Sequence, residues 1–382
     1  MSPDPMLRPR YHFTPEKGWI NDPNGPVFYK GKYHLFYQHD PESLVWDRMH
    51  WGHAVSYDLL SWEYLPIALF PDDMGDIYSG SAVVDKENVS GLGSKEDPAL
   101  LLFYTSHHME TKREQQCLAY SRDGLTFTKH GKNPVILGKA HTPARDPHVI
   151  ANPVLGGFTM TFTQEDKVVF YHSEDLLSWD KTGEFLPPEK ALHGMIECPC
   201  MFSCRVEGES APETSRYVLI LSMDIPEEEF SKLPEGCVPH NRLMQYFVGD
   251  FDGKTFILDE SYSGPLMVDD GPDFYAGTIF SNVSDPILIS WLGDFSEGAR
   301  IPMEKEGFRG VMSYPRKLSL GYENGAYFLK QEFYPDPNEI SKRYPADPEV
   351  SYAGEGGTEI LRDHCVEEMI ADGKMALTRF VK

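Results

Sequence analysis

Three short segments place acidic residues in contexts that suit catalysis. Asp22 lies within Trp-Ile-Asn-Asp-Pro-Asn-Gly-Pro at residues 19–26, Asp146 within Arg-Asp-Pro at residues 145–147, and Glu197 directly before a cysteine. Cleavage of a glycosidic bond commonly uses carboxylates in separate roles, one to attack or to activate water and one to protonate the leaving oxygen. The three segments therefore predict one glycosidase site, assembled from distant parts of the chain.

Each segment also has a simpler explanation. Asp, Pro, Asn and Gly are favoured turn residues, so residues 21–25 could be only a turn. Arg145 and Asp146 could form a surface ion pair, although neighbours in an extended segment point to opposite faces. Glu197 could lie at a strand edge, but residues 194–203 are mostly apolar or sulfur-containing. Such surroundings favour the protonated acid that a proton donor needs.

Three cysteines after the Glu197 motif raise the alternative of a metal site. Cys198, Cys200 and Cys204 have a spacing that resembles that of zinc ligands. No second Cys/His cluster at zinc-like spacing follows them, which disfavours structural zinc. In a chain of 382 residues with no apolar leader-like segment at its start, the six cysteines are expected to be reduced thiols, and the expected location is cytoplasmic.

The composition excludes several classes of partner. The formal net charge is −24, which repels nucleic acid and anionic lipid at long range. No apolar run approaches the length of a membrane span, so neither a nucleic acid nor a membrane is expected as a partner. With 41% hydrophobic residues, 22 Phe and 20 Tyr, the chain has ample material for a folded core.

Many short β-like runs, separated by 30 Pro and 32 Gly, indicate an all-β protein. A degenerate repeat refines this prediction. Residues 51–62 and 171–179 share Ser-x-Asp-Leu-Leu-Ser-Trp, and residues 119–127 and 249–256 are weaker copies. Each copy follows a strand-like run, contains a Ser/Asp turn and closes on an aromatic residue, as ordinary hairpin turns also could. With a fifth unit at residues 273–320, the pattern predicts a five-bladed β-propeller.

The sequence pattern changes near residue 320. Residues 1–320 are predicted to form the propeller that carries the catalytic site, and residues 321–382 a short C-terminal β extension with a Pro-rich linker. Two aromatic and polar stretches look like the walls of a sugar pocket, because sugars present both apolar ring faces and hydroxyl groups. They are residues 36–38 with Trp46, and residues 78–81.

Taken together, these motifs resemble those of glycoside hydrolase family 32, the invertases, fructan exo-hydrolases and related β-fructofuranosidases. The similarity covers residues 9 to 320 and runs in family order. It also includes Phe-Tyr-Gln at 36–38, His-Trp-Gly-His-Ala-Val-Ser at 50–56, Tyr-Ser-Gly-Ser-Ala at 78–82, Asp-Phe-Tyr-Ala at 273–276, Arg-Gly at 309–310 and Pro-Arg at 315–316.

The resemblance implies a five-bladed β-propeller with a funnel-shaped site and a retaining mechanism on fructosyl units of sucrose and short fructo-oligosaccharides. Asp22 would be the nucleophile, Glu197 the acid/base and Asp146 the transition-state stabiliser, with the Asp22 and Glu197 carboxyl groups about 5–5.5 Å apart. No metal or organic cofactor is implied. The resemblance also implies that the fructose pocket is lined by Asn21, Gln38, Trp46, Tyr78, Ser79, Arg145, Tyr275 and Trp291.

The C-terminus departs from this family, which usually carries a complete β-sandwich after the propeller. We expect the shorter extension either to pack on the propeller as a reduced sheet or to be completed by a second subunit as a homo-oligomer. Hydrolysis of sucrose 6-phosphate and fructosyl transfer are the alternative activities. A fructan-binding propeller that has lost catalysis is the non-enzymatic alternative, and an inverting arabinanase-like propeller is disfavoured by the motif at residues 19–26.

Overall fold

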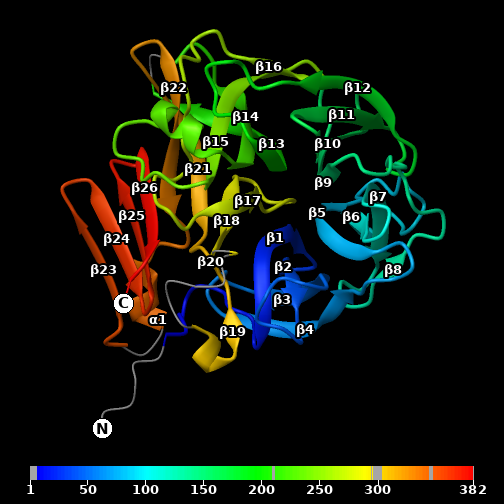
Figure 1. The fold of residues 1–382 in the computed structure, drawn as a ribbon, viewed down its shortest axis with the longest axis horizontal. Coiled ribbons are helices and arrows are strands. Elements are labelled where there is room, and N and C mark those ends of the chain that lie inside the picture. The colour runs from blue at the N-terminus through cyan, green and yellow to red at the C-terminus, as the bar shows by residue number, and fades with distance from the viewer. Residues whose placement is uncertain (1–6, 209–210, 294, 296–302, 344–346, 382) are drawn as a thin grey trace.

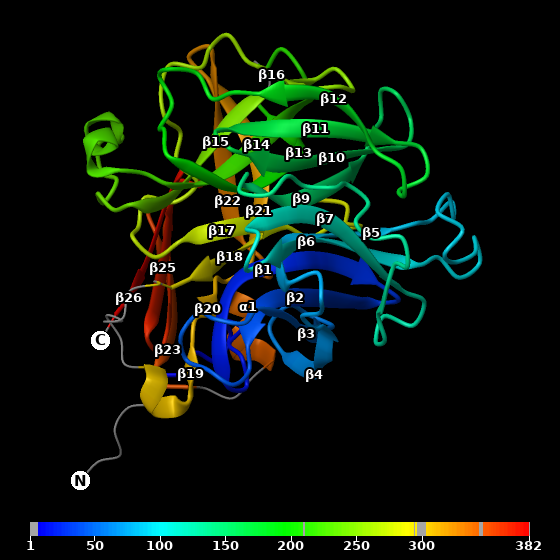
Figure 2. The ribbon, with the colours of Figure 1, turned by 45° about the vertical axis from the view of Figure 1, so that its right-hand side comes forward.

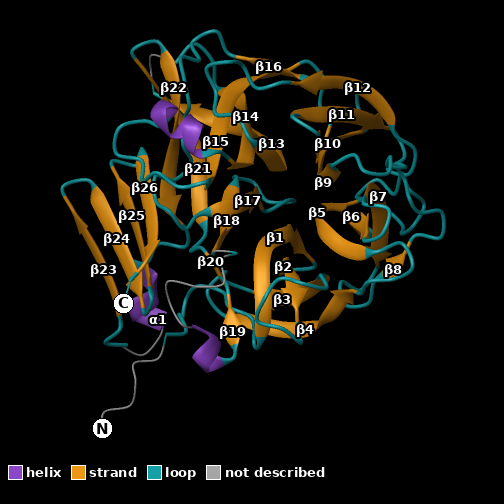
Figure 3. Ribbon diagram, in the orientation of Figure 1, coloured by secondary structure: helices purple, strands orange, loops and turns teal. Residues whose placement is uncertain are grey.

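The computed structural model describes residues 7–208, 211–293, 295, 303–343 and 347–381. Within these ranges the chain is almost entirely β-strand (Figure 3), which confirms the all-β prediction. The exceptions are two 3-10 helices, η1 (Glu227–Lys232) and η2 (Met303–Glu306), and one short α-helix, α1 (Asn338–Arg343). None of the described helices has the length and apolar character needed to cross a membrane.

Most strands are arranged in sheets around a central axis (Figure 1), as a β-propeller. The first sheet contains β1 (Gly18–Tyr29), β2 (Lys32–Asp40), β3 (His50–Ser56) and β4 (Trp62–Leu69), and the second β5 (Asp76–Val84), β6 (Leu100–His108), β7 (Arg113–Ser121) and β8 (Thr128–Lys129). The third contains β9 (Ala144–Ala151), β10 (Phe158–Gln164), β11 (Lys167–Ser173) and β12 (Asp180–Phe185).

The remaining propeller strands form one nine-stranded path. It contains β13 (Met195–Glu207), β14 (Ser215–Asp224), β15 (Arg242–Phe251), β16 (Phe256–Leu258), β17 (Tyr275–Ile279), β18 (Ile287–Leu292), β20 (Val311–Met312), β21 (Arg316–Glu323) and β22 (Ala326–Phe333). β13 and β21 are joined only by a short parallel contact at Val206–Leu320 and Glu207–Gly321. Divided there, the path gives a fourth and a fifth sheet, a grouping consistent with the predicted five blades.

The innermost strands contact one another in sequence, β1 with β5, β5 with β9, β9 with β13, β13 with β17, and β17 with β1. The ring is closed by chain segments from the fifth sheet. The two-residue strand β19 (Phe308–Arg309) pairs in parallel with Gly18 and Trp19 of β1, and Ser281 bridges to Val27 at the other end of β1. The two ends of the propeller are therefore tied together by backbone hydrogen bonds.

The repeated Ser/Asp turn predicted from the sequence connects the third and fourth strands of the first three sheets. In the first, Ser56 Oγ accepts from the Leu59 amide at 2.8 Å, and Asp58 Oδ1 accepts from the Ser61 amide at 2.9 Å. Asp123, Asp175 and Asp252 accept from amides two and three residues on in the same way, the last in the fourth sheet without a preceding serine. The sequence repeat therefore corresponds to the same turn, capped by an Asp side chain, in four of the sheets.

The fifth sheet differs from the prediction at its boundary. β21 runs across the expected division at residue 320, and β22 pairs with it along its whole length. The turn between them is Asn324-Gly325 with positive φ at both residues, a hairpin turn that replaces the Ser/Asp motif. The propeller strands therefore end at Phe333, because the hairpin assigned to the extension is the outer part of the fifth sheet.

The C-terminal extension is an antiparallel sheet of four strands beside the fifth sheet (Figures 1 and 2). Its strands are β23 (Val350–Glu355), β24 (Thr358–Asp363), β25 (Val366–Ala371) and β26 (Met375–Phe380). Leu361, Ile370 and Ala376 pack with Tyr314 and Phe333 of the propeller side in one apolar cluster. The extension thus packs one face against the propeller.

A buried network of charges joins this sheet to the propeller. His12 Nδ1 lies 2.8 Å from Asp363 Oδ2, and its Nε2 lies 3.1 Å from Glu368 Oε1. Arg316 Nη2 lies 2.6 Å from Glu368 Oε2, and Nη1 lies 2.9 Å from Asp269 Oδ2. Burial alone lowers the pKa of His12, but the hydrogen bonds and charges of Asp363 and Glu368 outweigh it and raise that pKa to about 9.

The Glu368→Gln substitution tests the strength of this network. Glu368 is the one anion that contacts both Arg316 and His12, and an uncharged amide interacts with two buried cations much more weakly, so we expect a loss of roughly 3–5 kcal/mol in the free energy of unfolding. Urea denaturation at pH 7 measures it. The matched control is Glu332→Gln on β22, which is exposed and lies 3.8 Å from Lys317, and it should cost less than about 1 kcal/mol. Equal losses in the two variants would contradict the expectation.

Candidate active site

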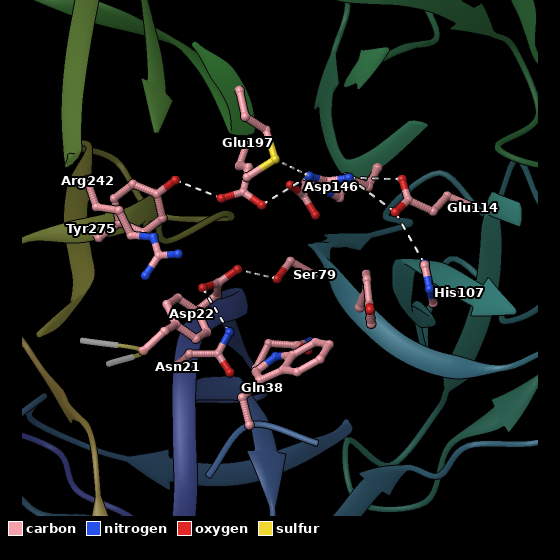
Figure 4. Close-up of a pocket in the computed structure, with 15 residues that line it drawn as sticks. Asn21, Asp22, Gln38, Ser79, His107, Glu114, Asp146, Glu197, Arg242 and Tyr275 are labelled. Atoms are coloured by element: carbon pink, nitrogen blue, oxygen red, sulfur yellow. Dashed lines mark hydrogen bonds and ion pairs between the residues drawn. The ribbon is translucent and has the colours of Figure 1, made fainter. Parts of the chain in front are cut away.

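One pocket of about 370 Å³ lies where the innermost strands meet (Figure 4). It contains all three predicted carboxylates, with Asp22 from β1, Asp146 from β9 and Glu197 from β13. Seven of the predicted binding residues line it as well. They are Asn21, Gln38, Trp46, Tyr78, Ser79, Arg145 and Tyr275.

The backbone of each innermost strand is bulged at the level of the pocket. In β1 the ladder with β2 shifts between Ile20 and Pro23, and in β5 it shifts between Tyr78 and Gly80. The same irregularity occurs in β9 opposite Thr161 and Thr163, in β13 after Glu197, and in β17 after Tyr275. A bulge places an extra residue in the strand and turns its side chain to a new direction, which lets neighbouring residues of one strand face the same pocket.

Left-handed backbone accompanies three of these bulges. Asp146 has φ of +68°, Cys198 of +47° and Ala276 of +55°. Non-glycine residues adopt this conformation at a cost of about 1 kcal/mol or more, so the surrounding sheet must hold it in place.

Asp22 is held by three donors. Asn21 Nδ2 donates to its Oδ1 at 3.0 Å, and Ser79 Oγ donates to its Oδ2 at 2.6 Å. The Cys198 thiol lies 3.4 Å from the same Oδ2. Asn21 is fixed in turn, because the Trp19 indole donates to its Oδ1 at 2.8 Å. The carboxylate is thereby oriented at the floor of the pocket, as a nucleophile requires.

Glu197 has different partners. Arg145 Nη2 donates to Oε1 at 3.2 Å and the Tyr275 hydroxyl donates to Oε2 at 2.7 Å. Burial, aided by the negative charge of Glu197, raises the pKa of Tyr275 well above its usual value, so this hydroxyl keeps its proton. The side chain of Glu197 is 23% exposed and lies among polar groups, in contrast to the apolar surroundings predicted from its sequence neighbours.

Asp146 is the most buried of the three carboxylates. Its Oδ2 accepts from the Cys198 amide at 2.9 Å, and its own amide donates to Thr105 Oγ1 at 2.9 Å. Burial raises its pKa to about 8. The charge of Arg145 opposes this rise, and the charges of Glu197 and Asp22 add to it. Three carboxylates with different donors and different burial thus surround one cavity, an arrangement that suits glycoside cleavage.

Residues 12–332 match the glycosyl hydrolases family 32 N-terminal domain, which is most of the chain. The chain belongs to glycoside hydrolase family 32. The levanase of Bacillus subtilis is 39% identical over 322 residues, which cover 83% of this chain and 45% of the levanase. The invertase of Schizosaccharomyces pombe is 36% identical over 327 residues, 82% of this chain and 53% of the invertase. The chain therefore spans about half the length of these two family 32 proteins.

A solved family structure has the same fold. The exo-inulinase of Aspergillus awamori superimposes with a TM-score of 0.82 at 26% identity, covering 100% of this chain and 94% of the inulinase chain. Membership in family 32 places the chain in a family of glycoside hydrolases.

One predicted binding residue is not in the pocket of this family 32 chain. Trp291 is fully buried, and its ring packs against Trp19 at 5.9 Å and Phe295 at 4.8 Å between centroids. It does not line the pocket, contrary to the prediction. Its place on β18, one strand outward from the pocket, turns the indole into the core beneath Trp19.

The pocket also contains residues that the sequence did not reveal. They are His107, Glu114, Met195, Arg242 and Phe295. His107 and Glu114 come from β6 and β7, which lie behind the innermost strand, and no motif surrounds them. Arg242 lies over the Phe295 ring at 4.3 Å and pairs with Asp224 at 3.3 Å. β7 begins Arg-Glu-Gln-Gln, and nothing in that polar run distinguishes Glu114 from its neighbours.

All six cysteines are free thiols. Cys198 faces Asp22, Cys200 lies 3.6 Å from His148 Nε2, and Cys204 is in the core between the fourth and fifth sheets. The three residues with zinc-like spacing therefore lie in three different environments. Among the described residues, no group of three or more His, Cys, Asp or Glu side chains is arranged to hold a metal ion.

The raised pKa of Asp146 predicts a pH-dependent effect on stability. Protonation of this carboxyl stabilises the fold fully below its unfolded pKa of about 3.9 and ceases to do so as the pH rises through about 8. Asp146→Asn keeps the acceptor but cannot ionise. We therefore expect the variant to be more stable than the native protein by roughly 1–3 kcal/mol at pH 8, and by less at pH 5.

Thermal denaturation at the two pH values measures this difference. The control is Asp180→Asn on the exposed edge of β12, which should leave the stability at both values unchanged. A variant that is destabilised equally at pH 5 and pH 8 would count against a buried, uncharged Asp146.

Proposed function

We propose that this protein is a retaining β-fructofuranosidase that removes terminal fructosyl units from sucrose and short fructo-oligosaccharides. The observation that carries the proposal is the pairing of Asp22 and Glu197 across one pocket, each with its own set of donors. The names of its relatives support the substrate class, since they include a levanase and an invertase.

In the first step an oxygen of Asp22 attacks C2 of the fructosyl unit while the bond from C2 to the leaving oxygen breaks. Glu197 gives its proton to that oxygen, so the alcohol leaves neutral and a fructosyl ester forms on Asp22. In the second step Glu197 takes a proton from water, which attacks C2 and releases the carboxylate of Asp22. Retention by this route requires the two carboxyl groups to be about 5–5.5 Å apart.

The other residues have supporting roles in this proposal. Asp146, deep in the pocket, holds ring hydroxyls and stabilises the oxocarbenium-like charge once it is ionised. Asn21 and Ser79 orient the nucleophile, while Gln38, Trp46 and Tyr78 provide the polar and aromatic wall that a fructose ring needs. Tyr275 and Arg145 hold the acid/base.

Asp22→Asn and Glu197→Ala test the assignment of roles. We expect each to reduce kcat on sucrose by at least about 10³-fold, because each removes a group that makes or breaks a bond. Fructose release measures the rate, and NMR of the first product should show the β-anomer. Asp180→Asn is the control. An active Asp22→Asn variant, or an α-anomer as first product, would refute the mechanism.

One comparison of products separates the alternatives within the family. Sucrose, sucrose 6-phosphate, 1-kestose, inulin and levan are tested side by side with the wild-type protein. Preference for the phosphorylated disaccharide would indicate a sucrose-6-phosphate hydrolase, and longer products a fructosyltransferase. Binding without turnover on all five would indicate a fructan-binding protein. The cytoplasmic location and the homo-oligomer stay predictions, which cell fractionation and light scattering test.

A further inference from the structure

A continuous chain of hydrogen bonds connects the second sheet to Glu197. His107 Nδ1 lies 3.2 Å from Glu114 Oε1, and Arg145 Nη1 donates to the same carboxylate at 3.1 and 3.2 Å. The Ala144 amide donates to Glu114 Oε2 at 2.7 Å. The other arm of the Arg145 guanidinium reaches Glu197. Figure 4 shows His107, Glu114 and Glu197 along one side of the pocket.

We propose that Glu114 is a positioning residue that acts through Arg145 to orient Glu197 and to keep it protonated until the leaving group departs. The inference rests on the proposed function, and it assigns a role to a residue with no part in bond making. Glu114 is 5% exposed, so its charge is not screened by solvent as a surface carboxylate would be.

One cation, Arg145, is shared between Glu114 and Glu197. Arg145 lies between two carboxylates and directly precedes a third, Asp146. If Arg145 faced Glu197 alone, its full charge would favour the ionised carboxylate, which cannot donate a proton. Glu114 takes up one arm of the guanidinium and adds a second negative charge behind it. Both effects make the proton on Glu197 easier to keep.

The network keeps Glu114 ionised for this task. Burial alone raises the pKa of Glu114, but the hydrogen bond from His107 and the charge of Arg145 outweigh burial and lower that pKa. His107 is itself stacked on Tyr78, with ring centroids 4.5 Å apart and planes 7° apart. The His107 ring, at the far end of this series of hydrogen bonds, is therefore held in place by Tyr78 of the pocket wall.

The charged and titratable groups around Glu197 come from several strands. Arg145 and Asp146 lie on β9, Asp22 on β1, Cys198 on β13, Tyr275 on β17, and Arg242 lines the pocket from β15. Around Glu114 they are His107, Arg145 and Tyr78. The substitution tested below changes only one charge in this set.

The pH dependence of kcat/KM for the Glu114→Gln variant tests the proposal, because its alkaline limb reports loss of the proton donor in the free enzyme. Without the second negative charge, Glu197 loses its proton more readily. We expect the alkaline limb to move to lower pH by about one unit. Glu114→Asp keeps the charge, so its limb should stay where it is in the wild type, even if its rate falls.

Glu184→Gln is the matched control, since it removes the same charge from the exposed strand β12, where Glu184 pairs with Lys167 and Lys181. Its profile should equal that of the wild type. A Glu114→Gln variant with a lower rate but an unmoved alkaline limb would overturn the proposal and leave Glu114 as a structural partner of Arg145.

If Glu114→Gln does not fold, His107→Gln is tested in its place. Loss of the imidazole removes a hydrogen bond that favours the ionised form of Glu114, so the alkaline limb should move to lower pH by a smaller amount. An unmoved limb overturns the proposal. If the wild-type protein releases no fructose from any of the five fructosides, the proposed function has failed, which is distinct from an active enzyme whose limb is insensitive to Glu114.

Discussion

The site depends on one backbone constraint, the interruption of all five innermost strands at the same level. A regular strand sends alternate residues to opposite faces, so it can offer only every second side chain to a pocket. The bulges in β1, β5, β9, β13 and β17 remove this limit where the strands converge. They allow Asn21 and Asp22, or Arg145 and Asp146, to serve one cavity from adjacent positions. The left-handed residues among them are the local cost of that arrangement.

The charged side chains in the pocket determine what it can do chemically. Four carboxylates, those of Asp22, Glu114, Asp146 and Glu197, line a pocket whose deepest cation is Arg145. Each of them has its own donors and its own degree of burial. Asp146 is the one whose pKa rises to about 8. The pocket is therefore less stable than an apolar core would be, as is common where a site is built for catalysis.

Much of this site could be predicted from the sequence, because Asp22, Asp146 and Glu197 lie in rare local motifs on the innermost strands. A further signal lies in the sequence: the residue after each bulged position is Pro or Gly, at positions 23, 80, 147, 199 and 277. Such residues mark places where a ladder is interrupted. Glu114 and His107 could not be found in this way, since they reach the pocket from the second and third strands. Their position in the pocket depends on how the sheets are arranged around the propeller axis, which the local sequence does not show.

The misplaced Trp291 shows how residues outside the pocket still determine its floor. Its indole packs on Trp19, Trp19 donates to Asn21, and Asn21 donates to Asp22, the proposed nucleophile. The strand that carries Trp291, β18, pairs on one side with β17 at Tyr275 and on the other with β21 next to Arg316. Arg316 is in turn fixed by Glu368 of the C-terminal sheet. Both carboxylates of the proposed mechanism are thus connected to the fifth sheet, Asp22 through Trp19 and Glu197 through Tyr275. The C-terminal sheet is thus linked to the pocket through β21, β18 and β17, although none of its described residues lines the pocket.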